Sequence, residues 1–478
     1  MWDAGALTGA DGVAYASAAD VQAAIEEMRT HFRSGATRAV AARKRMLRAL
    51  LAYLKAHEAE ALEALHADLG KSEFEGYATE LGIVYDEIKT FLRHLGSWAR
   101  PRRVATPLAH VPSVSRVYPA PYGVSLVMSP WNYPLQLALV PVVDALGAGN
   151  CVVLKPSRTS RHTTAFLERL CAEVFDRRLV RCLPSGRAMN SWLLEVDADK
   201  IFFTGSPNVG RQIMAAAARD LTPVTLELGG KSPCIVAADA KVDRAAQRIA
   251  WGKCINSGQT CVAPDYFLVH EDVVDEFVRG LERHLHEMYG DDILACPWYP
   301  HMINERHFDR VCGLIDDRGA DAQVVLGGGR DRATLKLEPT VLTGVSLDDP
   351  VMGEEIFGPV LPILTWRTFE DIEAITRRFG EPLACYVFSE SRAFQERVIE
   401  RLPFGGATIN DVVVHLANNH MGFGGVGESG MGAYHGKVGF DCFTHYKSTL
   451  RKSTLVEVPV RNAPFAPWKL KVVRLLMG

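Results

Sequence analysis

The sequence has 478 residues, of which 48% are apolar and 23% are charged. This length and composition are typical of a globular enzyme with two large domains, because one ordinary core does not reach this size. The formal net charge is only −3, from 53 basic and 56 acidic side chains, which argues against nucleic acid as a partner.

The ten cysteines are scattered, and none forms a Cys-x-x-Cys pair. This spacing argues against a metal site and against a disulfide framework, and it favours a reducing, cytoplasmic location. The N-terminus shows no signal-peptide pattern, and no apolar run is long enough for a transmembrane segment. We therefore expect a cytoplasmic protein that binds no metal.

The first 120 residues have mostly helical patterns. Residues 38–69 form an Ala-, Leu- and Arg-rich stretch that predicts one long helix ended by Gly70, and residues 81–95 predict another helix ended before Pro101. Residues 106–121 are rich in Pro and Val without a helical period, which predicts strands that cross between domains.

From Gly123 onward, strand and helix patterns alternate, which is typical of a doubly wound parallel sheet. A second alternating set follows Cys261 and predicts a second α/β domain, with the boundary near residue 232. The glycine-rich stretch 422–432 is either a flexible linker or a wall of the cleft. The expected strands are 124–128, 151–154, 201–203, 266–269, 323–326, 360–366 and 383–388, and the expected helices are 134–146, 161–175, 207–219, 274–289, 369–379 and 392–401.

Three residues carry the groups needed for covalent catalysis at a carbonyl. Cys261 lies between a helical and a strand pattern, where side chains face clefts, although most free cysteines are simply small buried hydrophobes. Glu227 ends an apolar run before two glycines, where a carboxylate is costly to bury unless it is used or paired. Asn132 offers an amide donor just before a helix that starts with proline.

Other motifs suggest a nucleotide site. Gly205 and Ser206 end a strand and begin a helix, an arrangement that binds phosphate but also serves as an ordinary helix cap. Lys155 and Ser157 end the preceding strand, at the edge where open α/β sheets bind ligands, although Lys-Pro is also a common turn. The segment 354–359 is either a plain loop or a source of a carboxylate for a ribose and a ring for stacking.

The chain resembles the aldehyde dehydrogenase superfamily, within it the class 3 branch that includes fatty and coniferyl aldehyde dehydrogenases. The resemblance extends from about Asp20 to Leu455. It rests on motifs in the family's order: Pro130-Trp131-Asn132, Lys155-Pro156-Ser157, Phe203-Thr204-Gly205-Ser206, Glu227-Leu228-Gly229-Gly230-Lys231, Gly258-Gln259-Thr260-Cys261 and Glu355-Ile356-Phe357-Gly358-Pro359.

The resemblance implies the catalytic roles. Cys261 attacks the aldehyde, and the Asn132 side chain with the Cys261 backbone N–H holds the oxyanion. Glu227 then activates the water that hydrolyses the thioester. The cofactor is NAD or NADP, and the residues implied to bind it are Trp131, Lys155, Ser157, Arg158, Gly205, Ser206, Gly210, Glu355 and Phe357.

The resemblance also implies the domain organisation. Residues 1–232, without about 106–121, form the NAD(P)-binding domain, and residues 233–430 form the catalytic domain that carries the nucleophilic cysteine. Residues 106–121 and 431–455 form a bridging element for a homodimer. Residues 456–478 form a C-terminal tail.

Three segments depart from the class pattern or extend beyond it. Arg158 stands where the class usually has Glu, which predicts that NADP is used at least as well as NAD. Pro184-Ser185-Gly186 replaces a common Glu-Gly-Gly on the adenine side. The tail mixes basic and apolar residues, and it caps the substrate mouth, touches a membrane surface or packs on the partner subunit.

We therefore expect oxidation of a medium- or long-chain aliphatic or an aromatic aldehyde to the carboxylic acid. Two alternatives remain open at this point. One is a CoA-acylating aldehyde dehydrogenase, against which Glu227 argues, since it activates water. The other is a catalytically silent structural protein on the same scaffold, against which the complete set of three catalytic residues argues.

Overall fold

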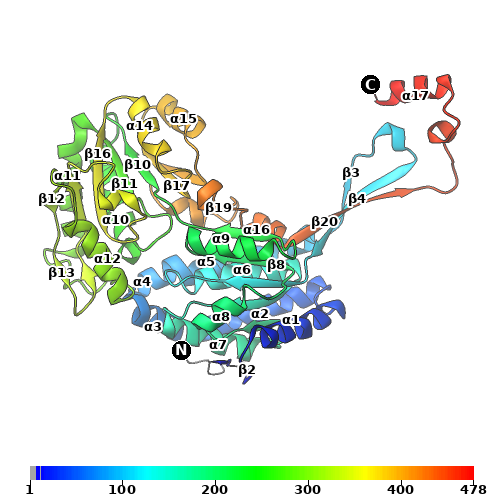
Figure 1. Ribbon diagram of the computed structural model, residues 1–478, viewed down its shortest axis with the longest axis horizontal. Coiled ribbons are helices and arrows are strands. Elements are labelled where there is room, and N and C mark those ends of the chain that lie inside the picture. The colour runs from blue at the N-terminus through cyan, green and yellow to red at the C-terminus, as the bar shows by residue number, and fades with distance from the viewer. Residues whose placement is uncertain (1–6, 11, 478) are drawn as a thin grey trace.

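The computed structural model describes residues 7–10 and 12–477. Two α/β bodies lie side by side, and a long arm projects from one of them (Figure 1). Strands β1 (Leu7–Thr8) and β2 (Ala14–Tyr15) form a short antiparallel pair at the N-terminal end.

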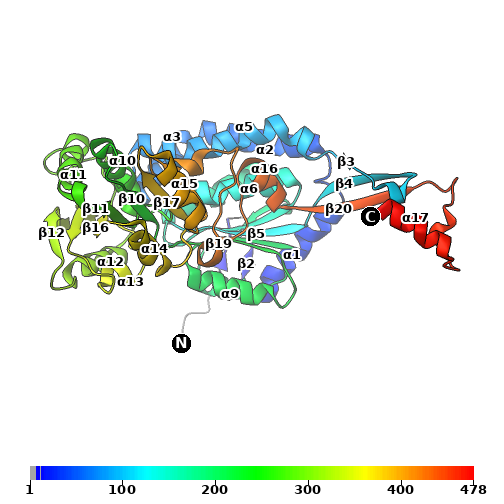
Figure 2. The same ribbon diagram turned by 90° about the horizontal axis from the view of Figure 1, so that it is seen from above.

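The first body is built on a six-stranded sheet in the order β19-β9-β8-β5-β6-β7. Its strands are β5 (Val124–Met128), β6 (Cys151–Lys155), β7 (Val180–Cys182), β8 (Lys200–Thr204), β9 (Val224–Glu227) and β19 (Gly430–Met431). The pairs are parallel except β19–β9. Helices cover both faces, with α5 and α16 on one side and α9 on the other (Figure 2).

The helices of this body are α1 (Ala18–Arg33), α2 (Val40–Ala56), α3 (Glu58–Leu69), α4 (Glu73–Gly76), a π-helix (Tyr77–Leu81), α5 (Gly82–Trp98), α6 (Gln136–Ala148), α7 (Arg161–Val174), α8 (Arg187–Trp192), α9 (Pro207–Ala217) and α16 (Gly436–Cys442). Every residue of α6 is buried, as expected for a helix that is apolar on all sides. Helix α6 therefore lies at the centre of the core, and it begins just after the segment that carries Asn132.

The expected single helix over 38–69 is wrong. The helix stops at Ala56, and His57 adopts a non-helical backbone (φ −116°, ψ 26°) before α3 begins. The His57 ring stacks on Tyr53 at 4.2 Å and lies 2.7 Å from the Glu60 carboxylate. No glycine or proline marks this break in the sequence. The contacts of His57 with Tyr53 and Glu60 are what the structure shows at the junction.

The second body is built on a seven-stranded sheet in the order β12-β15-β16-β11-β10-β17-β18. All its pairs are parallel except β12–β15. Its strands are β10 (Pro233–Val236), β11 (Tyr266–His270), β12 (Gln323–Leu326), β15 (Thr340–Thr343), β16 (Val360–Trp366), β17 (Ala384–Phe388) and β18 (Gly406–Ile409), with a small hairpin of β13 (Arg330–Asp331) and β14 (Lys336–Leu337). The helices are α10 (Val242–Cys254), α11 (Val274–Tyr289), α12 (Glu305–Asp316), α13 (Pro350–Gly353), α14 (Phe369–Arg377) and α15 (Arg392–Arg401).

The arm is a three-stranded antiparallel sheet of β3 (Arg102–Val104), β4 (Ser113–Pro121) and β20 (Thr444–Lys452). Strands β4 and β20 pair along their whole length, from Thr444 opposite Pro121 to Lys452 opposite Ser113. Helix α17 (Pro467–Met477) lies at the tip of the arm, far from both large sheets in this chain (Figure 1).

The glycine-rich stretch 422–432 packs against the first sheet. Gly430 pairs with Glu227 and Met431 with Leu226, and Phe423 bridges to Tyr434. A Cβ on Gly424 would collide with the Gly432 carbonyl, so the two ends of the stretch lie in direct contact. No helix in the described part of the chain combines the length and the apolar run that a bilayer crossing requires.

Candidate active site

Four strands of the first sheet end next to one another. Met128 at the end of β5 pairs with Lys155 of β6 and with Phe203 of β8, and Thr204 of β8 pairs with Glu227 of β9. The residues that follow β5 and β8, including Asn132, Gly205 and Ser206, therefore meet at the carboxyl edge of this sheet. Ligands of open α/β sheets bind at this edge.

Cys261 lies in the loop between a short 3₁₀ turn (Ile255–Gly258) and β11. Its side chain is partly exposed, whereas eight of the other nine cysteines are buried. Burial, followed by the negative charges of Glu355 and Glu227, raises the pKa of the Cys261 thiol to about 12. The backbone N–H groups of Cys261 and Val262 point to the sulfur and act in the opposite direction.

Asn132 is buried, and its side chain contacts the cysteine loop directly. Its Nδ2 donates to the Gln259 carbonyl at 3.0 Å, two residues before Cys261. The Asn132 carbonyl accepts from Asn256 Nδ2 at 2.7 Å. Asn132 and Cys261, which are far apart in the sequence, are therefore brought together through the backbone of residues 259–261.

A buried ion pair beneath this contact was missed from the sequence. Lys71 Nζ donates to Glu80 Oε1 at 2.5 Å and to the Asn132 carbonyl at 3.2 Å. Glu80 Oε2 accepts from the backbone N–H groups of Leu135 and Gln136 at 2.8 and 3.1 Å, at the start of α6. The signal that could have found this pair is the presence of charged residues inside an otherwise apolar helical pattern.

A second buried carboxylate also contacts the cysteine loop. Glu75 Oε1 accepts from the Asn256 backbone N–H at 2.7 Å. Asn256 and the following Ser257 have φ values of 50° and 51°, which side-chain-bearing residues rarely adopt. Bonds to Glu75, Asn132 and Gln259 fix Asn256 in this conformation.

Glu227 ends β9 with its carboxylate in the protein interior. Both oxygens are buried and lack a hydrogen-bond partner among the described residues, and burial raises the pKa of Glu227 well above its usual value. Burial, and then the charges of Glu227 and Cys261, also raise the pKa of Tyr434, so this ring lies close to both groups. A buried carboxylate without a described partner is costly in free energy, and such groups are candidates for catalysis.

The segment 354–359 comes from the second body and closes over the first. The Phe357 ring packs edge-on against Trp131, with ring centroids 5.4 Å apart. A Cβ on Gly229 would meet the Glu355 carboxylate, so the two segments lie in direct contact here. Lys231 fixes the segment, because it pairs with Asp265 and donates to the Glu354 carbonyl at 2.8 Å.

Lys155 is buried at the end of β6 and forms no ion pair with a described carboxylate. Burial, and then the positive charge of Arg158, lower the pKa of Lys155 to about 8. Arg158 itself is exposed. The Ser157 hydroxyl accepts from the Thr159 N–H at 3.3 Å, which is the ordinary turn interaction.

Ser206 is the N-cap of α9, followed by Pro207, but its hydroxyl makes no capping hydrogen bond among the described residues. Gly210 lies one turn later, and a Cβ there would press into the Leu228 side chain. The start of α9 therefore presents free backbone N–H groups at the carboxyl edge of the sheet. Within the described residues, no group of three or more His, Cys, Asp or Glu could hold a metal ion.

The protein has two mostly parallel sheets, and the carboxyl edge of the first is of the kind that binds nucleotides. Cys261, Asn132 and Glu227 lie near this edge, an arrangement typical of a cofactor-dependent α/β oxidoreductase. The comparisons with known proteins give the family. Residues 9–449 match the model of the aldehyde dehydrogenase family. The chain belongs to this family, and it is an NAD(P)-dependent aldehyde dehydrogenase.

The relatives cover nearly the whole chain. The 4,4'-diaponeurosporen-aldehyde dehydrogenase of Staphylococcus aureus is 42% identical over 439 residues, which is 92% of this chain and 95% of that protein. The dimeric NADP-preferring aldehyde dehydrogenase of Rattus norvegicus is 42% identical over 94% of this chain and 98% of its own length. Family 3 member H1 of Arabidopsis thaliana is 41% identical over 95% of this chain and 94% of that protein.

Solved structures agree with the fold. A substrate-bound Staphylococcus aureus AldH superposes with a TM-score of 0.93 at 40% identity, covering 96% of this chain and 99% of that chain. An indole-3-acetaldehyde dehydrogenase in complex with NAD+ superposes with a TM-score of 0.84 at 28% identity, covering 94% and 92%. The expected doubly wound fold, the class 3 branch and the NAD(P)-dependent oxidation of aldehydes are therefore confirmed.

Proposed function

We propose that Cys261, Asn132 and Glu227 carry the reaction in this chain. The observation that supports this most directly is the Glu227 carboxylate, which is buried without a partner among the described residues yet acts electrostatically on the Cys261 thiol. The Cys261 thiol gives its proton to solvent water, and the resulting thiolate forms a bond to the aldehyde carbon as the carbonyl π electrons move to the oxygen. The developing oxyanion accepts hydrogen bonds from Asn132 Nδ2 and the Cys261 backbone N–H.

Bound NAD or NADP would accept the hydride from the former aldehyde carbon, which would leave a thioester on Cys261. Glu227 then removes a proton from water, and the resulting nucleophile attacks the thioester carbon and releases the carboxylic acid and the thiol. The raised pKa of Glu227 makes its ionised form a stronger base than a solvated carboxylate. None of these reaction steps requires a metal ion.

The residues at the carboxyl edge fit NAD or NADP. The free N–H groups at the start of α9, with Gly205, Ser206 and Gly210, suit a pyrophosphate. The buried ammonium of Lys155, with Ser157 and Arg158 beside it, suits the adenosine ribose. Trp131, Glu355 and Phe357 lie on the opposite side, where a carboxylate and aromatic rings suit the nicotinamide ribose.

We propose that the substrate is a medium- or long-chain aliphatic or an aromatic aldehyde, released as the free acid. An absorbance assay for reduced cofactor, with a panel of aldehydes and with and without CoA, tests this. Turnover that does not need CoA is expected. Strict dependence on CoA would mean that the acyl group is transferred to the thiol of CoA. No turnover with any aldehyde would mean that the protein is catalytically silent.

We propose the following organisation. Residues 1–232, without about 106–121, bind the cofactor, and residues 233–430 form the catalytic domain. Residues 106–121 and 431–455 join two copies into a homodimer through the arm, since its outer strands β20 and β3 each leave one edge unpaired among the described residues. A relative is named dimeric, which supports this. All ten cysteines are free, which supports a reducing, cytoplasmic location.

Cofactor preference should follow Arg158, because a guanidinium binds a 2′-phosphate whereas a Glu would repel it. Its charge already acts on Lys155. A charge-assisted hydrogen bond at this exposed site is worth roughly 1–2 kcal/mol, a bias of roughly 5–30-fold. We expect wild type to use NADP at least as well as NAD, and Arg158→Glu to favour NAD, measured as kcat/KM for both cofactors. A strong NAD preference in wild type that the substitution leaves unchanged would contradict this.

We propose that the tail 456–478 makes peripheral contact with a membrane surface. It is exposed, with Trp468, Leu470 and Leu475 beside the cations Lys469 and Lys471. Deleting it should abolish cosedimentation with vesicles of anionic lipid and alter the preference among long aldehydes. Turnover of small aldehydes should stay within about twofold, because no catalytic group lies in the tail. Loss of the dimer together with all activity would instead show that the tail packs on the partner subunit.

A further inference from the structure

A cavity of about 730 Å³ lies at the root of the arm, away from the catalytic groups. We call it the arm-root cavity, and its polar lining consists of Arg33, Arg38, Arg43, Tyr122, His445 and Lys447. Tyr122 lies just before β5 and Ala148, also in the lining, just before β6. The cavity is therefore at the amino edge of the first sheet, whereas the active site is at the carboxyl edge.

The charge of this cavity is strongly unbalanced. Three arginines and one lysine line it, and no Asp or Glu of the described chain does. None of these four cations forms an ion pair with a described carboxylate. In a protein with a net charge of −3, such a concentration of uncompensated cations around one hollow is unusual and raises the local concentration of anions.

Arg43 is the strongest single observation, because it is only 7% exposed. Its guanidinium donates to the carbonyls of Thr37, Gly147 and Arg38, at 2.7 to 3.3 Å, and no acid in the described part of the chain neutralises its charge. Burial without such a partner lowers the pKa of Arg43 to about 10. Three bonds to carbonyls leave two of the five guanidinium N–H groups unused. An anion at this position would stabilise the buried positive charge.

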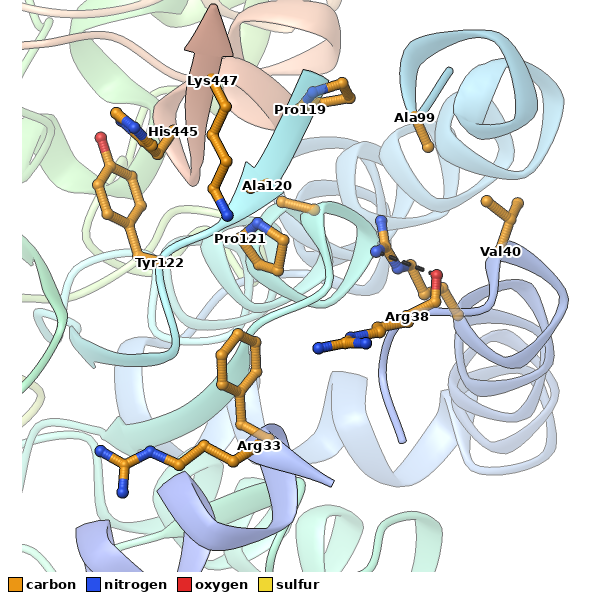
Figure 3. A pocket seen from close by; sticks show the side chains of 13 residues that line it. Arg33, Arg38, Val40, Ala99, Pro119, Ala120, Pro121, Tyr122, His445 and Lys447 are labelled. Atoms are coloured by element: carbon orange, nitrogen blue, oxygen red, sulfur yellow. Dashed lines mark hydrogen bonds between the residues drawn. The ribbon is translucent and has the colours of Figure 1, made fainter. Parts of the chain in front are cut away.

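Two of the cations come from different elements and point toward one space. Figure 3 shows Lys447, on β20 of the arm, and Arg38, between α1 and α2, pointing from opposite walls toward the same space beside Pro121. Phe32 and Val40 add apolar surface to the same walls. The volume lies within the range of about 300–1,000 Å³ that is typical of small-molecule sites.

We propose that the arm-root cavity binds a small phosphate compound that carries at least two phosphate groups. Guanidinium groups match phosphate oxygens as paired donors, and separated cations favour an anion that reaches several of them at once. A carboxylate offers one charge and fits this arrangement less well. The ligand joins the arm to the helical body, because its contacts come from β20 on one side and from α2 and the α1–α2 segment on the other.

The test is calorimetric titration of the full-length enzyme with inorganic pyrophosphate, at low ionic strength and with saturating NADP to occupy the cofactor site. We expect binding of about one pyrophosphate per chain, at least about tenfold tighter than inorganic phosphate, since pyrophosphate reaches two cations together. The variant Arg38→Glu/Lys447→Glu should weaken pyrophosphate binding by at least about tenfold.

The matched control is Arg45→Glu/Arg48→Glu, which changes the net charge equally on the exposed side of α2 and outside the cavity. It should bind pyrophosphate within about twofold of wild type. Equal weakening in both variants would show a general charge effect and overturn the proposal. Equal affinity for phosphate and pyrophosphate would also overturn it. The absence of any binding would overturn it too, and this is the result expected if a second copy of the chain fills the cavity. Should the charge reversal fail to fold, Arg38→Ala/Lys447→Ala serves in its place.

Discussion

Replacing Cys261 by serine should lower kcat for aldehyde oxidation by at least about 10⁴-fold, because the sulfur forms the bond to the aldehyde carbon. A serine hydroxyl in this setting has no base that gives it comparable nucleophilicity. Cofactor binding, measured by titration, should stay within about twofold, since the proposed contacts to the cofactor come from other residues. The measurement is steady-state formation of reduced cofactor with a saturating aldehyde.

Cys442 provides the matched control for this substitution. It is the only other cysteine that is partly exposed among the described residues, and its sulfur lies 3.2 Å from the Thr225 hydroxyl. Cys442→Ser should keep turnover within about twofold, and the buried cysteines should lose at most stability when replaced. Near-normal turnover in Cys261→Ser would show that the covalent mechanism is wrong.

Strongly periodic segments could be located from the sequence almost to the residue. The patterns over 274–289 and 392–401 correspond to α11 (Val274–Tyr289) and α15 (Arg392–Arg401). Helix periodicity is strong there because one face packs on a sheet and the other faces water. The break at His57 could not be predicted, because no glycine or proline marks it in the sequence.

The residues proposed for chemistry could be named from the sequence because each lies in a short motif with an unusual residue type. The residues that hold them could not. Lys71, Glu80 and Glu75 act through hydrogen bonds to Asn132 and Asn256, over separations that no local pattern encodes. The cations of the arm-root cavity likewise come from segments far apart in the chain, and only the fold brings them together.

Replacing Glu227 by glutamine should separate the two halves of the reaction. Formation of the thioester needs the thiol, the oxyanion donors and the cofactor, all of which the variant retains. Hydrolysis of the thioester needs a base, which glutamine does not provide. A stopped-flow trace should therefore show a burst of about one equivalent of reduced cofactor per chain, followed by a steady-state rate lowered by about 10²–10⁴-fold.

The pH dependence of the steady state provides an independent check on this assignment. Burial raises the pKa of Glu227, so its ionised fraction, and with it the rate of deacylation, increases as the pH rises through this raised pKa. Glu227→Gln should lose this rise, whereas Glu396→Gln, an exposed carboxylate on α15, should keep it. A variant that shows neither a burst nor turnover would contradict this assignment, since Glu227 would then either accept the proton of Cys261 or hold the structure together.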